Sequence, residues 1–445
     1  MMRSWDAERI AAQAGAELRA PAGARAGAGG PGPGRVVIDS REVGRGDLFV
    51  GLPGARADGG TFAATALAAG AWGVLVAPEH AAILAGTAPG AVLAAAEPLA
   101  ALQRLATAWR RELGCAVIGI TGSTGKTSTK DVLRGMLEPY RPVVATEQNL
   151  NTEIGVPLTI LGAPAGTAVL VLEMAMRGSG QIAELARIAQ PDVGVIVNIG
   201  PVHLELLGSI EAIARAKAEL LGALPAGGTA VIPAGEALLE PYVRDDLVTV
   251  RFGPGGDVDT LPERLTLPFD SAHMRRNALA ALAAARAVGV EPAGAVRVAL
   301  SRMRGQRIEL ARGIVVINDC YNANPMSMRA ALDDLAETAR ARRVAVLGDM
   351  LELGPQEHDF HAQIGEHARA AGVELLVTVG PLAQAAAAAF GDGALALAGA
   401  ADAARALPGL LRDGDTVLVK ASRGVGLEVV AEALADAPGV PAERA

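Results

Sequence analysis

The chain has 445 residues, of which 51% are hydrophobic and 20% are charged, and its formal net charge is −8. This length is typical of a globular protein of roughly two to four domains, and a negative charge without a basic cluster argues against a nucleic-acid-binding surface. Two cysteines are too few for a disulfide framework, and no uncharged apolar stretch reaches the ~18 residues of a membrane span. Because the N-terminus carries charge where a signal peptide is apolar, we expect a cytoplasmic protein without membrane insertion.

Residues 1–95 are predicted to form a small α/β domain. They begin with a helical pattern and pass through a Gly- and Pro-rich segment at 23–34, a composition typical of connectors. A strand at Arg35–Asp39 follows, and short apolar strands then alternate with a helix. An amphipathic helix over 98–113 is expected to lead into the next domain.

The segment Val117–Lys130 predicts a phosphate-binding P-loop, because an apolar strand, a glycine turn, a lysine and a helix start follow one another. Ile120 stands where the longer form of the motif has glycine, so the pattern is the shorter T-G-x-x-G-K-T. Lys126 is expected to reach the β- and γ-phosphates of a nucleoside triphosphate, and Thr127 to bind Mg²⁺. The phosphate-facing residues are Gly122, Ser123, Thr124, Gly125, Lys126, Thr127 and Ser128.

Around this loop, residues 96–311 alternate strands with helices, which predicts a mostly parallel sheet. Glu173 ends one predicted strand, and Asn198 and His203 follow the next. Ligands of parallel sheets bind at the carboxyl ends of the strands, so a carboxylate and an imidazole there could complete a Mg²⁺ site. Since Mg²⁺ prefers oxygen ligands, an ordinary capping or hydrogen-bonding role for His203 stays open. The expected strands are 168–172, 193–198 and 229–232, and the expected helices are 130–137, 181–189, 210–221 and 276–288.

Lysine occurs only four times, at Lys126, Lys130, Lys217 and Lys420, and every other basic residue is an arginine. Arginine and lysine differ chemically, so a chain rich in arginine can keep lysine where an amine is needed. Lys217 lies in a predicted helix, where the alternative is an ordinary solvated lysine. No role is predicted for Lys130.

Residues 312–445 repeat the alternation and predict a second doubly wound, Rossmann-like domain with strands at 314–318, 343–347, 375–379 and 416–419. No G-x-G-x-x-G turn opens it, so a dinucleotide site is not expected. Polar residues again follow the predicted strands. They are Asp319, Asn322, Asn324, Asp349, Lys420, Ser422 and Arg423.

Together these motifs resemble those of the Mur ligases of peptidoglycan synthesis, whose P-loop has the same short form. Within that family, the run YNANP resembles the loop of the ligases that add a D-alanyl-D-alanine dipeptide. Sister ligases that add one amino acid tend to carry a different loop at this place. Thr124 and Gly60 depart from the family pattern, which usually has Asn and His there. The other matching runs are DSR (39–41), NLNTEIGVPLTIL (149–161), EMAMRGSGQI (173–182), NIGPVHLELLGSIEAIARAKAEL (198–220), DCYNANPMSM (319–328), VLGDMLELG (346–354) and VKASRG (419–424).

The resemblance implies an α/β ligase of three domains: a UDP-precursor-binding domain (1–95), a central ATPase domain (96–311) and a C-terminal Rossmann-like domain (312–445). It implies a monomer that uses ATP and Mg²⁺ to join D-alanyl-D-alanine to UDP-N-acetylmuramoyl-tripeptide through an acyl phosphate. A sister Mur ligase or a folylpolyglutamate-type ligase is the alternative enzyme. A P-loop regulator or an inactive binding paralogue is less favoured, because no N-K-x-D motif is present and Lys126, Glu173, His203 and Lys217 are all retained.

The resemblance also implies roles at the nucleotide. Thr127, Glu173 and His203 would be metal ligands, and Lys217 would carry a CO₂-derived carbamate that binds a second Mg²⁺. The residues implied to contact adenine, phosphate and ribose are Asn277, Arg307 and Asp319.

For the two other substrates the implied residues come from all three domains. Ser40, Arg41 and Asp58 would hold the uridine diphosphate, and Asn149, Asn151 and Thr152 would face the UDP-sugar. The residues implied around the dipeptide are Asn322, Asn324, Asp349, Lys420, Ser422 and Arg423.

Overall fold

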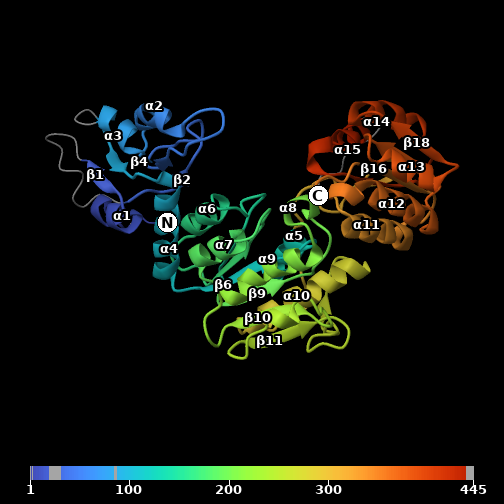
Figure 1. Ribbon diagram of the computed structural model, residues 1–445, viewed down its shortest axis with the longest axis horizontal. Helices are drawn as coiled ribbons and strands as arrows, with labels where there is room; N and C mark the ends of the chain where they lie inside the picture. The colour runs from blue at the N-terminus through green and yellow to red at the C-terminus, as the bar shows by residue number, and fades with distance from the viewer. Residues whose placement is uncertain (1, 3, 20–31, 85–87, 437–445) are drawn as a thin grey trace.

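The computed structural model describes residues 2, 4–19, 32–84 and 88–436. Three α/β bodies follow one another along the chain, and the first and third lie on either side of the second (Figure 1). This arrangement confirms the predicted fold class. Residues 23–31 of the predicted connector lie outside the described residues. Within the described part of the chain, no helix combines the length and the apolar character that crossing a bilayer requires.

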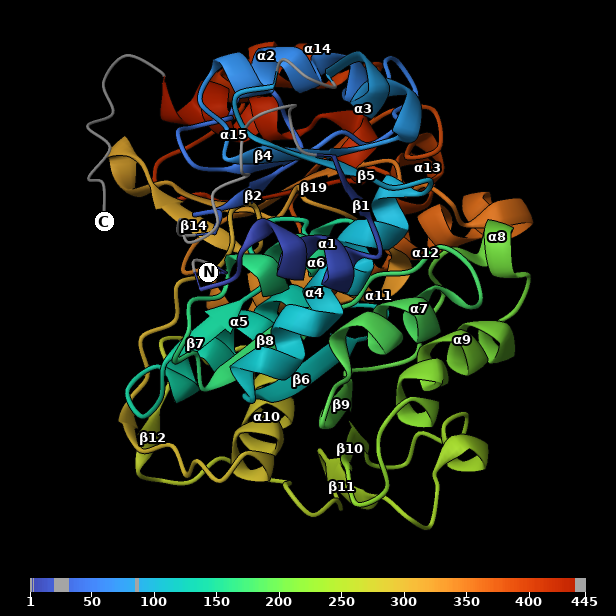
Figure 2. The same ribbon diagram turned by 90° about the vertical axis from the view of Figure 1, so that its left-hand side faces the viewer.

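The N-terminal body is a five-stranded sheet in the order β1-β5-β4-β3-β2, parallel except for β1, which pairs antiparallel with β5. Trp5 packs edge-on against Trp109 of α4 (Pro98–Leu113), with ring centroids 5.5 Å apart. Figure 2 shows α1 lying beside α4, which continues to the central sheet. The remaining elements are α1 (Ala7–Ala14), β1 (Glu17–Arg19), β2 (Val36–Val37), β3 (Leu48–Val50), α2 (Ala63–Ala68), β4 (Gly73–Val76), α3 (Pro78–Leu84) and β5 (Ala91–Ala94).

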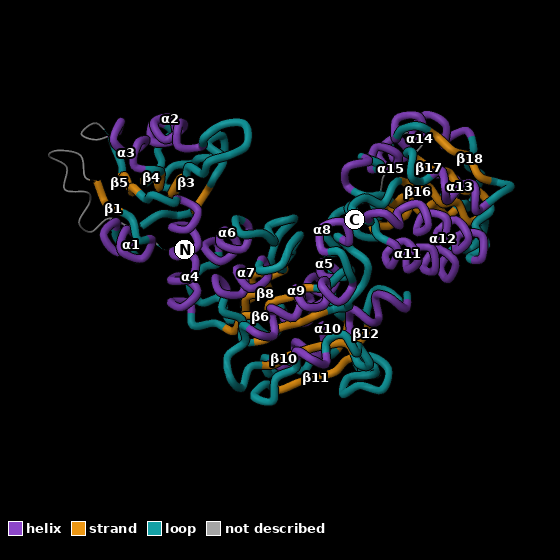
Figure 3. Tube along the Cα trace, in the orientation of Figure 1, coloured by secondary structure: helices purple, strands orange, loops and turns teal. Residues whose placement is uncertain are grey.

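The central body is a six-stranded, fully parallel sheet in the order β11-β10-β9-β6-β8-β7. Its strands are apolar runs because both faces are covered, as in other parallel sheets. Val117 of β6 belongs to one hydrophobic cluster, and Ile118 and Ile120 belong to another on the opposite face. Figure 3 shows helices on both sides of this sheet.

The P-loop strand β6 lies between β8 and β9, so the strand ends that carry Glu173 and Asn198 flank the P-loop. The helix after the loop begins at Lys126, four residues earlier than predicted. The elements are β6 (Ala116–Thr121), α5 (Lys126–Leu137), β7 (Val143–Ala145), α6 (Gly155–Gly162), β8 (Val169–Glu173), α7 (Gln181–Ala189), β9 (Val193–Ile196), α8 (Leu204–Leu207), α9 (Ile210–Gly222), β10 (Thr229–Pro233), β11 (Val248–Phe252), β12 (Leu265–Thr266), α10 (Ala272–Ala287) and β13 (Gly294–Ala295).

The C-terminal body is a six-stranded sheet in the order β14-β15-β19-β16-β17-β18, parallel except for β14, which pairs antiparallel with β15. The four predicted strands are present, and β14 and β18 complete the edges. The elements are β14 (Gln306–Glu309), β15 (Val315–Asn318), α11 (Pro325–Thr338), β16 (Arg343–Gly348), α12 (Glu357–Ala370), β17 (Leu375–Val379), α13 (Gln384–Phe390), β18 (Ala394–Leu397), α14 (Ala400–Ala406), β19 (Thr416–Lys420) and α15 (Glu428–Ala435).

Candidate active site

The P-loop turn has the geometry of a phosphate cradle. Gly125 has a φ of +75°, and a Cβ atom added there would lie 2.5 Å from Oδ1 of Asn277, so a larger residue would be strained and would collide. Helix α5 begins at the next residue, which directs its free N–H groups toward the turn. Nζ of Lys126 folds back and donates to the carbonyl oxygen of Gly122 at 2.8 Å.

Asn198, at the end of the neighbouring strand, braces this turn. Its Oδ1 accepts from the backbone N–H of Thr124 at 2.9 Å, and its Nδ2 donates to Oγ1 of Thr124 at 2.9 Å. Ser123 and Gly200 exchange two hydrogen bonds, Oγ to carbonyl at 3.0 Å and N–H to Oγ at 2.9 Å. The loop after β9 therefore fixes the P-loop backbone, a role that the sequence did not reveal for Asn198.

Glu173 is 1% exposed and joins three elements. Its Oε2 accepts from Oγ1 of Thr127 at 2.9 Å, and its Oε1 accepts from Nδ2 of Asn151 at 2.9 Å. Its backbone N–H donates to Oγ1 of Thr146. The hydroxyl and the carboxylate are therefore adjacent, and both are oxygen ligands of the kind that Mg²⁺ prefers.

No group of three or more His, Cys, Asp or Glu that could hold a metal ion occurs among the described residues. The adjacent oxygens of Thr127 and Glu173 fit a Mg²⁺ ion that takes its other oxygen ligands from nucleotide phosphates and water, the usual arrangement for this cation at phosphate sites.

Lys217 of α9 is 2% exposed, so the alternative of a solvated helix lysine is wrong. No hydrogen bond or ion pair of its ammonium group is found within the described ranges. Burial, reinforced by the charge of Lys126, lowers the pKa of Lys217 well below its usual range. The pKa of Lys126 is lowered chiefly by burial, which outweighs the nearby Glu173 carboxylate.

His203 follows β9 and is partly buried. Its Nδ1 lies 2.5 Å from Oε2 of Glu352, a residue of the C-terminal body. Burial lowers the pKa of His203, although the hydrogen bond and charge of Glu352 act in the opposite direction.

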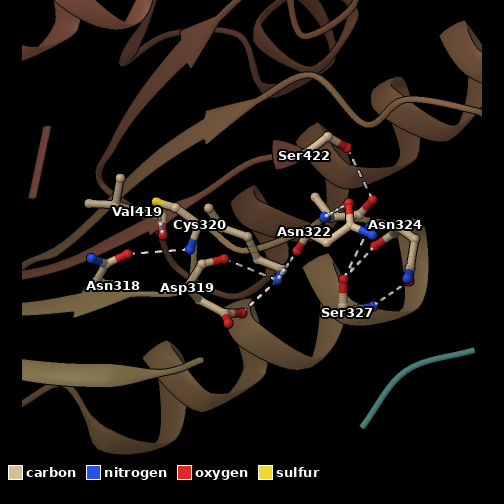
Figure 4. A network of polar contacts seen from close by, with 10 residues as sticks. Asn318, Asp319, Cys320, Asn322, Asn324, Ser327, Val419 and Ser422 are labelled. Carbon is tan, nitrogen blue, oxygen red and sulfur yellow. Dashed lines mark hydrogen bonds and ion pairs between the residues drawn. The ribbon is translucent and has the colours of Figure 1, made fainter. Parts of the chain in front are cut away.

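Polar residues at the carboxyl ends of β15 and β19 form one network (Figure 4). Nζ of Lys420 pairs with Oδ2 of Asp319 at 2.5 Å and donates to the carbonyl oxygen of Asn322 at 3.0 Å. Asn324 caps α11 in a capping box: its Oδ1 accepts from the backbone N–H of Ser327, and its own backbone N–H donates to Oγ of Ser327. The hydroxyl of Ser422 accepts from the N–H of Leu351 and donates to the carbonyl oxygen of Ala323.

Two adjoining cavities, of about 1480 and 1150 Å³, meet at the P-loop, and Lys126 and Thr127 line both. The larger cavity holds the predicted residues Ser123, Lys126, Thr127, Asn149, Asn151, Thr152, Glu173, His203, Asn322, Asn324, Ser422 and Arg423. The smaller cavity holds the predicted residues Ser123, Thr124, Gly125, Lys126, Thr127, Ser128, Asn277, Arg307, Asp319, Asn322, Asn324 and Lys420.

Several predicted residues line neither cavity. Lys217 is buried in α9, and Asp349 accepts from the N–H of Ala383 at 2.7 Å, which ties it to the start of α13. Ser40, Arg41 and Asp58 belong to the N-terminal body. The remaining residue outside both cavities is Gly122.

In the N-terminal body, Arg41 forms an ion pair with Asp39 at 2.5 Å, and its guanidinium lowers the pKa of Asp39 to about 2. Asp58 accepts from the N–H of Gly60 and lies 2.9 Å from Nε2 of His80. A Cβ atom on Gly60 would lie 2.2 Å from Cδ2 of His80, so the His80 ring occupies the space that a side chain at position 60 would need.

Other residues that the sequence did not reveal also face the cavities. Arg302 and Arg304 line both of them, and the guanidinium of Arg304 lies 4.0 Å from the centroid of the Tyr321 ring. Glu352 lines the larger cavity. The arginines gave no signal because the chain uses arginine almost wherever it needs a cation.

Comparison with known proteins gives a consistent result. Family models match the chain as "Mur ligase family, catalytic domain" over residues 35–110, "Mur ligase middle domain" over 120–261 and "Mur ligase, glutamate ligase domain" over 303–423. The UDP-N-acetylmuramoyl-tripeptide–D-alanyl-D-alanine ligase of Mycobacterium tuberculosis is 41% identical, covering 90% of this chain and 92% of the relative. The Bacillus subtilis ligase of the same name is 35% identical, covering 91% and 93%.

Solved structures agree with these sequence relatives. MurF from Acinetobacter baumannii superposes with a TM-score of 0.84 at 29% identity, covering 97% of this chain and 98% of that one. MurF from Thermotoga maritima in complex with ADP superposes with a TM-score of 0.77 at 30% identity, covering 90% and 96%.

Proposed function

The chain belongs to the Mur ligase family, and we infer that it joins D-alanyl-D-alanine to UDP-N-acetylmuramoyl-tripeptide. It is an ATP-dependent peptide ligase of peptidoglycan synthesis, and the sister ligases and folylpolyglutamate-type ligases are set aside because the relatives reported above all add D-alanyl-D-alanine. The observation that carries this function is the pair of cavities that meet at Lys126 and Thr127. At that junction, ATP can activate the carboxylate of the tripeptide, and the amine of the dipeptide can then attack it.

The reaction has two chemical steps. The terminal carboxylate of the tripeptide attacks the γ-phosphorus of ATP, so that a P–O bond to ADP breaks and an acyl phosphate forms. The amine of D-alanyl-D-alanine then attacks the acyl carbon, loses a proton and displaces phosphate. We propose that Lys126 and the N–H groups of the P-loop neutralise the transferred phosphoryl group, because phosphoryl transfer depends mainly on positioning and charge stabilisation.

Mg²⁺, when bound, neutralises phosphate charge and so lets a carboxylate approach. We propose that Thr127, Glu173 and His203 hold it, since all three line the larger cavity with Lys126. The adenine, phosphate and ribose are proposed to lie in the smaller cavity against Asn277, Arg307 and Asp319.

Carbamylation of Lys217 is a further part of the proposal. The neutral ε-amine attacks CO₂, an N–C bond forms, and loss of a proton leaves a carbamate anion. The burial of Lys217, its lowered pKa and the charge of Lys126 nearby support this, because they favour a neutral amine and then compensate a new anion. The carbamate oxygens would serve a second Mg²⁺.

We propose the following placement of the other substrates. Ser40, Arg41 and Asp58 hold the uridine diphosphate, and Asn149, Asn151 and Thr152 face the sugar from the wall of the larger cavity. The dipeptide lies near Asn322, Asn324, Ser422 and Arg423, with Lys420 close by and Asp349 supporting the loop. The domains are proposed to span 1–95, 96–311 and 312–445, in a cytoplasmic monomer. Strand β14 (Gln306–Glu309) lies before the last of these boundaries but belongs to the C-terminal sheet, because it pairs with β15.

Phosphate release measured with purified components tests the function. Release should require ATP, the UDP-tripeptide and D-alanyl-D-alanine together, and D-alanine alone should not replace the dipeptide. A single amino acid that supports equal release would contradict the assignment in favour of a sister ligase.

Lys217→Ala tests the carbamate separately. We expect near-complete loss of phosphate release, and partial recovery when a short carboxylate such as acetate is added. Arg215→Ala, two residues earlier in the same helix, is the matched control and should stay active. Full activity of Lys217→Ala, or a loss that no carboxylate rescues, would contradict the proposal.

A further inference from the structure

We propose that Glu352 of the C-terminal body is a positioning residue for His203 of the central body, and that it aims the imidazole at the nucleotide. The inference rests on the proposed function, in which His203 binds Mg²⁺. Glu352, a residue of another domain, is thereby added to that site. The imidazole of His203 is then oriented only when the central and C-terminal domains are in contact.

The hydrogen bond between the two side chains sets the chemistry of the ring. Nδ1 of His203 lies 2.5 Å from Oε2 of Glu352. A carboxylate only accepts hydrogen bonds, so Nδ1 must carry the proton, and the lone pair of a neutral ring then lies on Nε2. Metal-binding histidines commonly donate their other N–H to a carboxylate, which fixes both the tautomer and the ring plane.

The backbones at this contact are held in an uncommon conformation. His203 has a φ of +54° and Glu352 a φ of +63°, in the left-handed region that non-glycine residues seldom adopt. The N–H of Glu205 lies 3.4 Å from the carbonyl oxygen of Glu352, so the main chains also touch. Two such residues in direct contact across a domain boundary indicate a constraint on side-chain direction, because strained backbone persists only where the surroundings enforce it.

The same loop touches the C-terminal body at a second point. A Cβ atom on Gly200 would lie 1.8 Å from Sδ of Met326 in α11, so the methionine side chain packs directly against this glycine. Gly200 also holds Ser123 of the P-loop. Helix α8, which follows His203, lies beside the C-terminal body in Figure 1 and contacts the turn at Gly354–Gln356. One loop therefore links the P-loop, the histidine and the C-terminal domain.

Among the residues that the structure describes, the carboxylate of Glu352 has one other side-chain partner, which supplies a control. Its Oε1 lies 2.9 Å from Nη2 of Arg177, whose side chain is 72% exposed. Arg177→Met removes the cation that pairs with Glu352 and leaves the hydrogen bond between Glu352 and His203 in place. Because an exposed ion pair contributes little stabilisation, the loss of this pair should have a small effect.

The test measures metal affinity rather than turnover. MnCl₂ is titrated into the protein saturated with ADP, and free Mn²⁺ is followed by electron paramagnetic resonance. We expect Glu352→Ala to weaken Mn²⁺ binding by roughly 10- to 100-fold, as removal of a carboxylate behind a metal-binding histidine typically does. Glu352→Gln should lose less, because its amide oxygen still accepts from Nδ1, and Arg177→Met should change the affinity by less than about 3-fold. His203→Ala marks the loss of the ligand itself.

The outcomes separate the inference from the proposed function. If His203→Ala weakens Mn²⁺ binding and Glu352→Ala does not, the inference is overturned and the role of His203 stands. If neither weakens it, His203 is no ligand and both are overturned. The imidazole ¹⁵N shifts of His203 give a second readout. A protonated Nδ1 in the wild type that persists in Glu352→Ala would also overturn the inference, even if that variant melts at a lower temperature.

Discussion

The proposed nucleotide residues of the central body and the proposed uridine-diphosphate residues of the N-terminal body are held in different ways. Glu173 is 1% exposed and is tied to Thr127 and Asn151 from two other elements. Arg41, by contrast, has a side chain that is 87% exposed, and its ion-pair partner Asp39 is only two residues away. The first region is preorganised, so binding there needs little rearrangement, whereas Arg41 must exchange a partner when it meets a diphosphate.

The two regions also differ in their relation to the cavities. Lys126 and Thr127 line both cavities, and Ser40, Arg41 and Asp58 line neither. A precursor held at its uridine end by the N-terminal body therefore has to extend to the P-loop in order to react. We expect substitutions in the central body to affect the chemical step, and substitutions around Arg41 to affect binding of the precursor alone.

Lys126→Ala should lower the activity more than the other substitutions do. A small effect would contradict the view that the central region is a preorganised phosphate site. Removing the cation of a prebuilt phosphate site should lower kcat/KM by roughly 10³-fold, because preorganised charge supplies much of the stabilisation in phosphoryl transfer. ADP formation measures it. The control is Arg134→Ala, on the exposed part of the same helix, which should remain near wild type. Normal ADP formation by Lys126→Ala would contradict the P-loop assignment.

Much of the nucleotide region could be predicted because its determinants are close together in the sequence. A strand, a glycine turn, a lysine and a helix start within Val117–Lys130 define the cradle locally. Glu173 and His203 could be placed because the carboxyl ends of neighbouring parallel strands share one edge of a sheet. The topology confirms that β8 and β9 flank β6.

The remaining features depend on contacts between distant residues. Glu352 meets His203 across 149 residues, and no local pattern marks a pairing between two domains. The edge strands β1 and β14 have three and four residues, too short for a clear alternation of polar and apolar positions. His80 fills the space beside Gly60 from another element, which only the folded chain shows.

Lys130 shows the same limit, because the structure gives a role to a lysine for which none was predicted. It is 3% exposed, forms an ion pair with Asp131 at 2.8 Å and donates to the carbonyl oxygen of Thr146 at 2.8 Å. Asp131 in turn accepts from the N–H of Ser301, in the segment that leads to the C-terminal body. Lys130 and Asp131 therefore connect α5, which follows the P-loop, to the backbone at Thr146 and Ser301.

Lys130→Met tests whether that connection is separate from catalysis. Removing one member of a buried ion pair should lower the free energy of unfolding by about 3–5 kcal/mol, because Asp131 keeps its charge without its partner. Urea denaturation measures the loss, and kcat at low temperature should fall by less than about 10-fold. Arg134→Met, exposed on the same helix, is the stability control. A catalytic loss as large as that of Lys126→Ala, with unchanged stability, would show that the two lysines act together.

Arg41→Ala tests the N-terminal half of the comparison. Loss of a charge-assisted hydrogen bond to a diphosphate should raise the KM for the UDP-tripeptide by about 10-fold and leave kcat and the KM for ATP nearly unchanged. Steady-state phosphate release at varied UDP-tripeptide measures it. Arg45→Ala, an exposed arginine four residues along, should leave all three constants unchanged. A fall in kcat without a change in KM would place Arg41 in the chemical step.

Asp39→Asn should have the smallest effect on the kinetic constants. It tests directly whether Arg41 has to exchange a partner when the diphosphate binds. If Asp39 competes with the diphosphate for Arg41, its neutralisation should lower the KM for the UDP-tripeptide by no more than about 3-fold, the size expected from an exposed ion pair. Arg41 lowers the pKa of Asp39 to about 2, so this carboxylate stays ionised in any neutral assay. The ratio of the two KM values should therefore be constant between about pH 6 and 9. A higher KM in Asp39→Asn would mean that Asp39 aims Arg41 at the diphosphate, and the N-terminal region would then be as preorganised as the P-loop.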